Sequence, residues 1–524
     1  MSSQLYVHGD ILTMEDENPY VEAVFVKNGC IQKIGKKKEV EAYLEEDTKI
    51  IDLEGKTMLP SFIDAHSHIT AFAQTLAYVN LSSAKSIEEI IQKLQVYIKD
   101  RNLKEGEWVI GFGYDHNFLK EKRHPNKLDL DKISIKHPIL ISHASGHMGV
   151  TNSLGLEKMH ITDKTKDPEG GSYGRIDHSE EPDGYMEETA FMQKAKVAGN
   201  MTTQKYLDLL EEAQEIYLKN GITTVQDGLT KQQDFEMLKQ IAQKNRWKVD
   251  IVSYVDMADN KQIVQNNPSY VRQYQNHLKI GGYKIILDGS PQGRTAWLSE
   301  PYEGEVEYRG YPSKTEEQVK KCIQTSLEEH MQLLAHCNGD AAAQQYIESY
   351  VEESKQITDV DTRRPVMIHA QTVRNDQLQV MKQVAMIPSF FIAHTYYWGD
   401  VHIRNLGEQR AKRISPAKEA VDLNLCFTFH QDTPVIQPNM LETIWCAVNR
   451  KTKEGMVLGE EQCISVYEAL KAVTIYAAYQ YFEEGQKGSI KEGKKAQFVL
   501  LDKNPLKVPK EEINQIQVMQ TIYE

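Results

Sequence analysis

The stretch SFIDAHSHIT, residues 61–70, places two histidines one residue apart directly after a short apolar run. In a β-strand, residues two apart share a face, so Asp64, His66 and His68 point the same way and the two imidazoles can hold one ion. A His-x-His pair also occurs as an ordinary polar strand end. Other parts of the chain therefore have to supply partners before this stretch predicts a metal site.

Short apolar strands alternate with helical stretches through most of the chain, which is the pattern of a parallel sheet or barrel. We expect eight such strands, at TMLPSFIDAH (57–66), ITTVQDG (222–228), VDIVSYV (249–255), YKIILDGS (283–290), MQLLAHC (331–337), PVMIHAQ (365–371), AMIPSFFIAH (385–394) and LCFTFHQD (425–432). Eight such units predict an α/β protein built as a (β/α)8 TIM barrel.

A long segment interrupts this pattern after the first strand. Roughly 150 residues separate the first two strands, far more than one βα connection needs. The segment contains the strand-like runs EWVIGFGYD and HPILISHASG and an amphipathic helix, whose apolar face carries Ile87, Ile90, Ile91, Leu94 and Ile98. We expect a large insertion, a subdomain at about residues 75–205, at the mouth of the barrel.

Both ends of the chain have β patterns. Residues 1–57 consist of short alternating runs separated by turn residues, and residues 478–524 contain FVLLD and IQVMQTIYE, which are typical of strands. Neither end has enough apolar surface for a core of its own, and chain termini often lie close together. We expect both ends to pair into one small sheet beside a barrel of residues 58–477.

The composition argues against several kinds of partner. The 524 residues are 40% hydrophobic and 26% charged, as in ordinary soluble proteins, and the formal net charge is −14. Nucleic-acid binding requires a basic face, so no nucleic-acid partner is expected. The six cysteines lack Cys-x-x-Cys spacing, the N-terminus lacks a secretion signal, and no run approaches the roughly 18–20 apolar residues of a membrane span. We expect reduced cysteines, no membrane partner and a cytoplasmic location.

Polar side chains also end three other predicted strands. His336 ends QLLAH, His369 ends PVMIH and Asp432 ends LCFTFHQD, each after an apolar run. Catalytic residues of barrels come from the carboxyl ends of several strands. A core histidine bonded to a backbone carbonyl is the ordinary alternative for each residue singly, but four strands that end in this way indicate a shared site. Neutral imidazole and carboxylate are ligands that zinc prefers.

Lys284 stands inside the apolar strand GGYKIILDGS, on the face that carries Ile286 and Asp288. A buried ammonium group is costly unless it is paired. One interpretation is an ion pair with a neighbouring carboxylate such as Asp288. The other is a lysine that is held neutral, carboxylated by carbon dioxide, and so converted into an anion that bridges two cations.

Taken in chain order, the motifs resemble those of the amidohydrolase superfamily of metal-dependent hydrolases. The resemblance is to the branch that includes N-substituted formamide deformylase. The matching stretches cover nearly the whole chain and are LPSFIDAHSH, HASGHMGVTNSLGL, GITTVQDG, YKIILDGSPQGRTA, LLAHCNGDAA, MIHAQ, FHQDTPV and KGSIKEGKKAQFVLLDKNPL. The resemblance implies a metal-dependent (β/α)8 barrel beside a small β-sandwich built from both chain ends. It also implies a homodimer, because members of such families often pair.

The resemblance assigns roles to six residues at one or two divalent metal ions, with zinc expected. The implied ligands are His66, His68 and Asp432 for the more buried ion, His336 and His369 for a second ion, and Lys284, if carboxylated, as the bridge between them. The chain departs from the family just before Asp432, where Gly-Ser is common and this chain has His430-Gln431. His430 is therefore either an extra pocket group or a support for a ligand.

These roles predict a hydrolase that acts on a carbon–nitrogen bond other than a peptide bond, in an N-acyl or N-formyl amine or a related amide. A metal lowers the pKa of bound water from about 15.7 to about 7 and so supplies hydroxide for the attack. Asp432 is expected as general base and acid, and His369 as electrophile or acid if only one ion binds. Two alternatives stay open: a cyclic amide or ester hydrolase with the same site, and a non-catalytic regulatory or binding protein with a relic metal site.

Substrate contacts are expected from loops around the barrel mouth, and the expected partner is a small amide-type molecule. The candidate residues are Tyr114, Asp115 and His143 from the insertion, Ser290 and Arg294 after the fourth strand, and His394 and Trp398 after the seventh. For each of them, packing or a loop hydrogen bond is an equally good interpretation. Arg294 in particular can bind a substrate anion or pair with an acidic loop residue.

Overall fold

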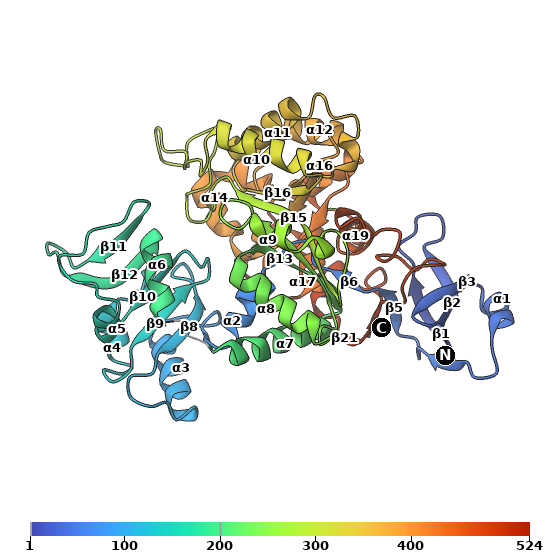
Figure 1. Ribbon diagram of the computed structural model, residues 1–524, viewed down its shortest axis with the longest axis horizontal. Helices are drawn as coiled ribbons and strands as arrows, with labels where there is room; N and C mark the ends of the chain where they lie inside the picture. Colours follow the sequence, from blue (N-terminus) through green and yellow to red (C-terminus); the bar gives the residue numbers. More distant parts are fainter. Residues whose placement is uncertain (1–2, 199–201, 524) are drawn as a thin grey trace. The chain divides into compact units, whose positions relative to one another are not determined.

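The computed structural model describes residues 3–198 and 202–523 (Figure 1). Residues 1–2, 199–201 and 524, which belong to the predicted terminal segments and insertion, lie outside this description. The chain divides into two compact units, one made of Met1–Ile69 with Gln214–Glu524 and the other of Thr70–Ala213. Each unit contains buried apolar clusters of its own.

An eight-stranded parallel sheet organises the first unit. Each strand pairs with the next one along the chain, so the order in space is the order in sequence. The strands are β6 (Phe62–Ile63), β13 (Ile222–Thr230), β14 (Asp250–Asp256), β15 (Leu278–Ile286), β16 (Gln332–Cys337), β17 (Val366–His369), β18 (Ile387–Phe390) and β19 (Thr428–Phe429). The predicted α/β fold, with eight parallel strands in chain order, is confirmed.

Both faces of this sheet are covered, as parallel sheets require. Almost every side chain along β13 and β15 is buried, whichever face it points to. One core cluster of the sheet joins Ile63, Val252, Leu334 and Ile368 from four different strands. The near-continuous apolar runs that predicted these strands are therefore a consequence of burial on both sides.

Helices separate most of the strands (Figure 1). They are α7 (Thr203–Lys219) before β13, then α8 (Gln232–Gln243), α9 (Gln262–Asn266), α10 (Glu316–Glu328), α11 (Asp340–Glu353) and α12 (Asn375–Gln383) between β13 and β18, then α13 (His394–Tyr397), α14 (Gly399–Leu406), α15 (Glu408–Lys412) and α16 (Ala417–Asp422) before β19, and finally α17 (Met440–Asn449), α18 (Val466–Ala472) and α19 (Ile475–Gln480). Among the described residues, no helix has both the length and the apolar character to cross a membrane.

The two ends of the chain share a seven-stranded sheet. Its path is β21–β20–β5–β1–β2–β3, and β4 also pairs with β1. The strands are β1 (Ser3–Leu12), β2 (Tyr20–Lys27), β3 (Cys30–Gly35), β4 (Lys49–Asp52), β5 (Thr57–Pro60), β20 (Phe498–Leu501) and β21 (Val518–Ile522), and the short helix α1 (Lys37–Val40) follows β3. The ends meet where β5 and β20 run antiparallel, with Met58 opposite Leu500. Both of these side chains belong to one apolar cluster.

The single strand predicted at residues 57–66 is wrong, because this stretch forms two strands in two different sheets. β5 pairs with β1 and β20, whereas β6 pairs with β13. Pro60 ends β5 and has no N–H for a further ladder bond. The Ser61 N–H then donates to Gln497 O (3.0 Å), and the next N–H, of Phe62, donates to Gly221 O (2.8 Å), so the chain changes sheets within two residues.

The second unit contains a six-stranded mixed sheet with the order β11–β12–β10–β9–β8–β7. Its strands and helices are β7 (Val79–Asn80), β8 (Val109–Tyr114), β9 (Ile139–His143), β10 (Met148–Thr151), β11 (Gly171–Arg175), β12 (Pro182–Glu188), α3 (Ile87–Asp100), α4 (Lys127–Asp131), α5 (Ser153–Lys158) and α6 (Thr189–Ala198), while α2 (Ile69–Thr75) leads into the unit. The amphipathic helix predicted from its isoleucines is α3. Ser86 caps it by accepting the Glu89 N–H, and its apolar face is buried.

Candidate metal centre

The six predicted metal ligands belong to the carboxyl-terminal parts of strands in the parallel sheet or to the residues just after them. They are His66 and His68 after β6, Lys284 in β15, His336 in β16, His369 at the end of β17 and Asp432 after β19. Two backbone hydrogen bonds join the segments that follow the first and last strands of the sheet, from Asp432 N–H to His66 O (3.1 Å) and from His68 N–H to Thr433 O (2.8 Å). The fold thus brings the two ends of this sequence pattern side by side.

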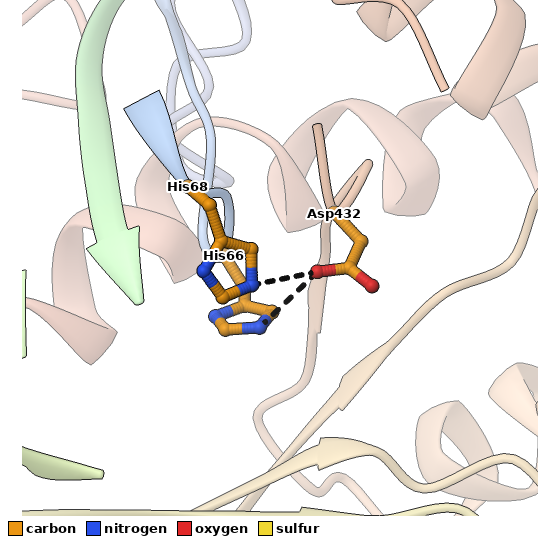
Figure 2. Close-up of side chains that lie close together, drawn as sticks. All are labelled: His66, His68 and Asp432. Carbon is orange, nitrogen blue, oxygen red and sulfur yellow. Dashed lines mark ion pairs between the residues drawn. The ribbon is translucent and has the colours of Figure 1, made fainter. Parts of the chain in front are cut away.

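His66, His68 and Asp432 form a compact group (Figure 2). Asp432 Oδ1 lies 3.4 Å from His66 Nε2 and 3.1 Å from His68 Nε2. Ligands about 2.0–2.1 Å from a tetrahedral zinc ion lie roughly 3.3 Å from one another. The three atoms therefore have the spacing of ligands that share one ion.

Gln226 fixes the proton on the His66 ring. The Gln226 side-chain NH2 donates to Ala65 O (2.9 Å) and to the Tyr481 hydroxyl (3.0 Å), so its Oε1 is left as an acceptor. That oxygen lies 2.5 Å from His66 Nδ1, which must carry the proton. His66 Nε2 is left with a lone pair, and this lone pair faces Asp432. Burial, followed by the charge of Lys284, also holds the pKa of His66 well below its usual value, so the ring is neutral.

Asp432 is ionised although its carboxylate is largely covered, with 14% of the side chain exposed. Burial opposes the charge, but the neighbouring His68 side chain outweighs it and holds the pKa of the carboxyl well below its usual range. Among the described residues, Asp432 Oδ1 is a buried atom that accepts no hydrogen bond. Buried polar atoms almost always have partners. An ionised, unsatisfied oxygen beside two imidazole nitrogens fits a bound cation.

His336 and His369 form a second pair of candidate ligands. His336 Nε2 lies 3.1 Å from both Gly289 O and the Asn338 side-chain nitrogen, and in the tautomer that donates to Gly289 O its Nδ1 keeps the lone pair. That Nδ1 lies 3.1 Å from His369 Nε2, which in turn is 4.0 Å from Asp432 Oδ2. The space between the two nitrogens can be filled by one proton or by one metal ion.

His430 lies behind His369 rather than among the candidate ligands. Its Nε2 is 3.2 Å from His369 Nδ1, and its Nδ1 is 2.9 Å from Ser389 Oγ. When the His430 ring donates to Ser389, its Nε2 accepts the His369 Nδ1–H and leaves His369 Nε2 free for an ion. Carboxylate, carbonyl or other acceptors commonly orient metal-bound histidines in this way.

Lys284 is a buried lysine without a carboxylate partner in the described part of the chain. Its Nζ contacts His66 Nε2 at 3.4 Å. Asp288, the partner considered for it, instead accepts the backbone N–H groups of Asn338 (2.9 Å) and Gly339 (2.7 Å). Burial lowers the pKa of Lys284 to about 7, although the charge of Asp432 opposes this. A large share of the amine is therefore neutral near pH 7, as its carboxylation requires.

Asp64 does not contact the imidazoles of the pair that follows it. Its Oδ1 accepts the backbone N–H of His66 (3.3 Å), and burial raises its pKa to about 8. Gln226, and not Asp64, orients the His66 ring. Sequence reasoning missed Gln226, although one polar residue inside the apolar run ITTVQDG was a signal that could have pointed to it.

The seven residues predicted to contact substrate belong to different units. Ser290, Arg294, His394 and Trp398 belong to the unit of the parallel sheet, and Tyr114, Asp115 and His143 to the inserted unit. Arg294 pairs with Glu305 (2.9 Å), in line with the loop ion pair considered for it. His394 is buried against Phe391, whose ring also lies 5.3 Å from that of His430, and it contacts His402 (3.0 Å). Trp398 packs on His394, with ring centroids 4.6 Å apart.

Comparison with known proteins identifies a family and several relatives. Residues 49–524 match the amidohydrolase family. The chain is 26% identical to the putative amidohydrolase YtcJ of Bacillus subtilis, over 98% of this chain and 97% of the relative, and 24% identical to the N-substituted formamide deformylase of Arthrobacter pascens, over 99% and 97%. A crystal structure of an uncharacterized metal-dependent hydrolase from Pyrococcus horikoshii has a TM-score of 0.78 at 25% identity and covers 97% of this chain and 99% of its own. The chain belongs to the amidohydrolase family.

Proposed function

We propose that this protein hydrolyses a carbon–nitrogen bond other than a peptide bond, in an N-acyl or N-formyl amine or a related amide, with the help of bound divalent metal. One observation carries the proposal. His66 Nε2, which has a lone pair, and the ionised Asp432 Oδ1 lie 3.4 Å apart with no proton to share. Two electron-rich atoms at this distance repel each other unless a cation lies between them.

The residues present fit one or two ions of the zinc class. His66, His68 and Asp432 would hold one ion, and His336 and His369 a second, with a carboxylated Lys284 joining the two. When bound, such ions acidify water and polarise a carbonyl group. Imidazole and carboxylate donors favour zinc over calcium or magnesium, which prefer all-oxygen sites.

Asp432 is the group that moves protons in this proposal. Its carboxylate is ionised and largely covered, it contacts the rings of both histidines of SFIDAHSHIT, and it can take a proton from the attacking water and deliver it to the leaving nitrogen. His369 stands on the other side of the carboxylate, 4.0 Å from Oδ2. With a single ion bound, His369 would take the part of electrophile or acid.

The substrate class is supported by a relative and by the surroundings of the site. The Arthrobacter pascens relative is named for N-substituted formamides. Phe391 contacts His369, His394 and His430, and Trp398 packs against both Phe391 and His394. An aromatic wall of this kind suits an amide with an apolar substituent. His394 and Trp398 are our candidates for contacting that substituent, and Ser290 for a polar contact.

We also propose that the parallel sheet closes as a barrel and that both chain ends form a β-sandwich. The backbone bonds between the segments after β6 and β19 support a sheet that closes as a (β/α)8 barrel, and the pairing of β5 with β20 supports a small β-sandwich made from both chain ends. The cytoplasmic location, the homodimer and the absence of nucleic-acid and membrane partners stay predictions from the sequence.

The test combines metal analysis with a substrate panel. The full chain, purified without chelators, is analysed for divalent metals and then assayed with N-formyl amines, N-acetyl amines, cyclic amides and esters. The proposal expects one or two equivalents of zinc per chain that depend on the six predicted ligands, and turnover of the open-chain amides. Turnover of cyclic amides or esters alone would favour the alternative of a cyclic amide or ester hydrolase with the same site. Metal binding with no turnover of any class would favour the non-catalytic alternative, and absence of bound metal would remove the proposal altogether.

A further inference from the structure

A second cluster of imidazole and carboxylate groups lies in the inserted unit. Asp115 directly follows β8, His116 comes next, and His143 ends β9. β8 and β9 are parallel neighbours with Tyr114 opposite His143, so their carboxyl ends bring these three side chains to one edge of the sheet. One ligand atom from each residue lies within 4.8 Å of the other two.

The distances within this cluster do not match ordinary charged hydrogen bonds. Asp115 Oδ1 lies 3.4 Å from His143 Nε2 and 3.8 Å from His116 Nδ1. A charge-assisted N–H···O bond measures about 2.7–2.9 Å. Ligands of a tetrahedral zinc ion are separated by roughly 3.3 Å, which is closer to what the cluster shows. Both nitrogens thus lie beside one carboxylate oxygen at distances longer than those of such a bond.

Both of these ring nitrogens are buried and unsatisfied. His116 Nδ1 and His143 Nε2 have no hydrogen-bond partner within the residues that the structure describes. The whole His143 side chain is nearly inaccessible, at 6% exposure. Buried polar atoms without partners are rare and call for a specific explanation, such as an ion between them.

Neighbouring groups orient the cluster. The backbone N–H of Asn117 (2.8 Å) and its side-chain NH2 (3.0 Å) donate to Asp115 Oδ1 and fix the carboxylate. His143 Nδ1 lies 2.9 Å from Ser145 Oγ, which can accept the ring proton and leave Nε2 with its lone pair. The Ser145 backbone N–H also faces this nitrogen at 3.1 Å, so uptake of an ion requires the ring proton to move from Nε2 to Nδ1.

Other imidazoles pack around the His116 ring. The His124 ring lies over that of His116, with centroids 4.0 Å apart, and its Nδ1 contacts the Tyr114 hydroxyl at 2.9 Å. Burial, and then the neighbouring His143 ring, lowers the pKa of His116, while burial lowers that of His124 to about 3. Neutral imidazoles are the form that binds metal.

We propose that Asp115, His116 and His143 bind a divalent transition-metal ion of the zinc class within the inserted unit. Two imidazoles and one carboxylate suit zinc better than calcium or magnesium. Three protein ligands leave one tetrahedral position, which water or an anionic group of a ligand would fill. No residue of the candidate centre in the parallel sheet takes part, so the two proposals stand or fall separately.

The test measures zinc in the full chain. Wild-type protein and the variants Asp115→Ala and His143→Gln are stripped with a chelator, reloaded with zinc, freed of excess metal and analysed for zinc per chain. Each variant is expected to hold about one equivalent less than the wild type. The matched control is His147→Gln, a histidine of the same unit whose Nδ1 pairs with Glu188 (2.9 Å) outside the cluster, and it is expected to lose none. Folded variants that retain the full wild-type zinc content would overturn the proposal.

A measurement on the wild type alone covers the case in which a variant does not fold. Crystals of the full chain grown with zinc are measured at the zinc absorption edge. The proposal expects an anomalous peak among Asp115 Oδ1, His116 Nδ1 and His143 Nε2. A map that shows zinc elsewhere in the chain and none at these three atoms would overturn it, whatever the variants do.

Discussion

His66 Nε2 and Asp432 Oδ1 lie 3.4 Å apart although neither atom carries a proton. Gln226 accepts the only proton of the His66 ring at Nδ1, and Asp432 is ionised. The lone pair of the nitrogen and the charge of the oxygen repel each other at this distance, so the arrangement needs positive charge between them. A metal ion provides it, and the buried amine of Lys284, 3.4 Å from the same nitrogen, is the nearby alternative.

Asp432→Asn separates metal binding from proton transfer. The amide oxygen can still act as a ligand, but it cannot accept a proton at neutral pH. We expect the zinc content to stay close to that of the wild type and kcat to fall by about 10²–10⁴-fold, the usual contribution of a general base. Metal analysis and steady-state kinetics on the best substrate of the panel give both values. A variant with near-wild-type turnover would show that another group moves the proton.

His430→Phe tests the support of His369. The phenyl ring fills the space but offers no acceptor to His369 Nδ1, so His369 Nε2 is no longer held ready for an ion. Loss of such a supporting contact typically weakens metal affinity by about 10–100-fold. Competition with a chromogenic chelator measures the affinity.

The control for this variant is His402→Phe. His402 is another buried imidazole of the same unit, and it contacts His394 rather than a predicted ligand. We expect the metal affinity of this variant to equal that of the wild type. Equal weakening in both variants would point to general damage of the core rather than to the contact between His430 and His369.

Lys284→Arg tests carboxylation. The guanidinium group keeps the positive charge, but it is protonated at any ordinary pH and does not react with carbon dioxide. After incubation with ¹³C-bicarbonate and zinc, we expect a carbamate carbon signal in the NMR spectrum of the wild type and none in the variant. The variant should also bind fewer metal ions, since the bridge is lost. A wild-type spectrum without that signal would contradict the bridging role.

Lys487→Met tests a buried ion pair at a residue that is far in sequence from the predicted metal ligands. Lys487 is fully buried and contacts both Asp250 and Glu483. Replacing it with methionine leaves the Asp250 charge without this partner, so we expect the free energy of unfolding to fall by about 3–5 kcal/mol. Urea unfolding of the full chain, followed by circular dichroism, measures the difference. Lys418→Met, which removes the exposed pair with Asp422, should cost less than about 1 kcal/mol.

The stability difference between the wild type and Lys487→Met depends on pH in a defined way. Burial opposes the charge of Lys487, but Asp250 and Glu483 outweigh it and raise its pKa from 10.5 to about 12. A lysine whose pKa is higher in the folded than in the unfolded chain stabilises the fold. This stabilisation is complete at pH values below the unfolded pKa and is lost as the pH rises through the folded pKa. The gap between wild type and Lys487→Met should therefore be constant at neutral pH and narrow between pH 10.5 and about 12. A constant gap throughout that range would contradict the ion pairs.

The sequence alone determined the parallel sheet and the order of the predicted ligands. Strands that are covered on both faces need continuous apolar runs, and a polar residue at the end of such a run stands out against them. His66, His336, His369 and Asp432 could therefore be found as strand-end residues. Another local signal found α3, because its apolar period lies within one short segment.

The tertiary structure decided everything that depends on residues far apart in the chain. That Gln226 orients His66, that His430 supports His369 and that Asp288 turns to backbone N–H groups instead of Lys284 all follow from contacts across strands. The split of residues 57–66 between two sheets has the same origin, since Gln497 and Gly221 supply the acceptors on either side. A pattern of residue types records which side chains are buried, but hydrogen bonds are chosen by distance and direction, and only the folded chain sets these.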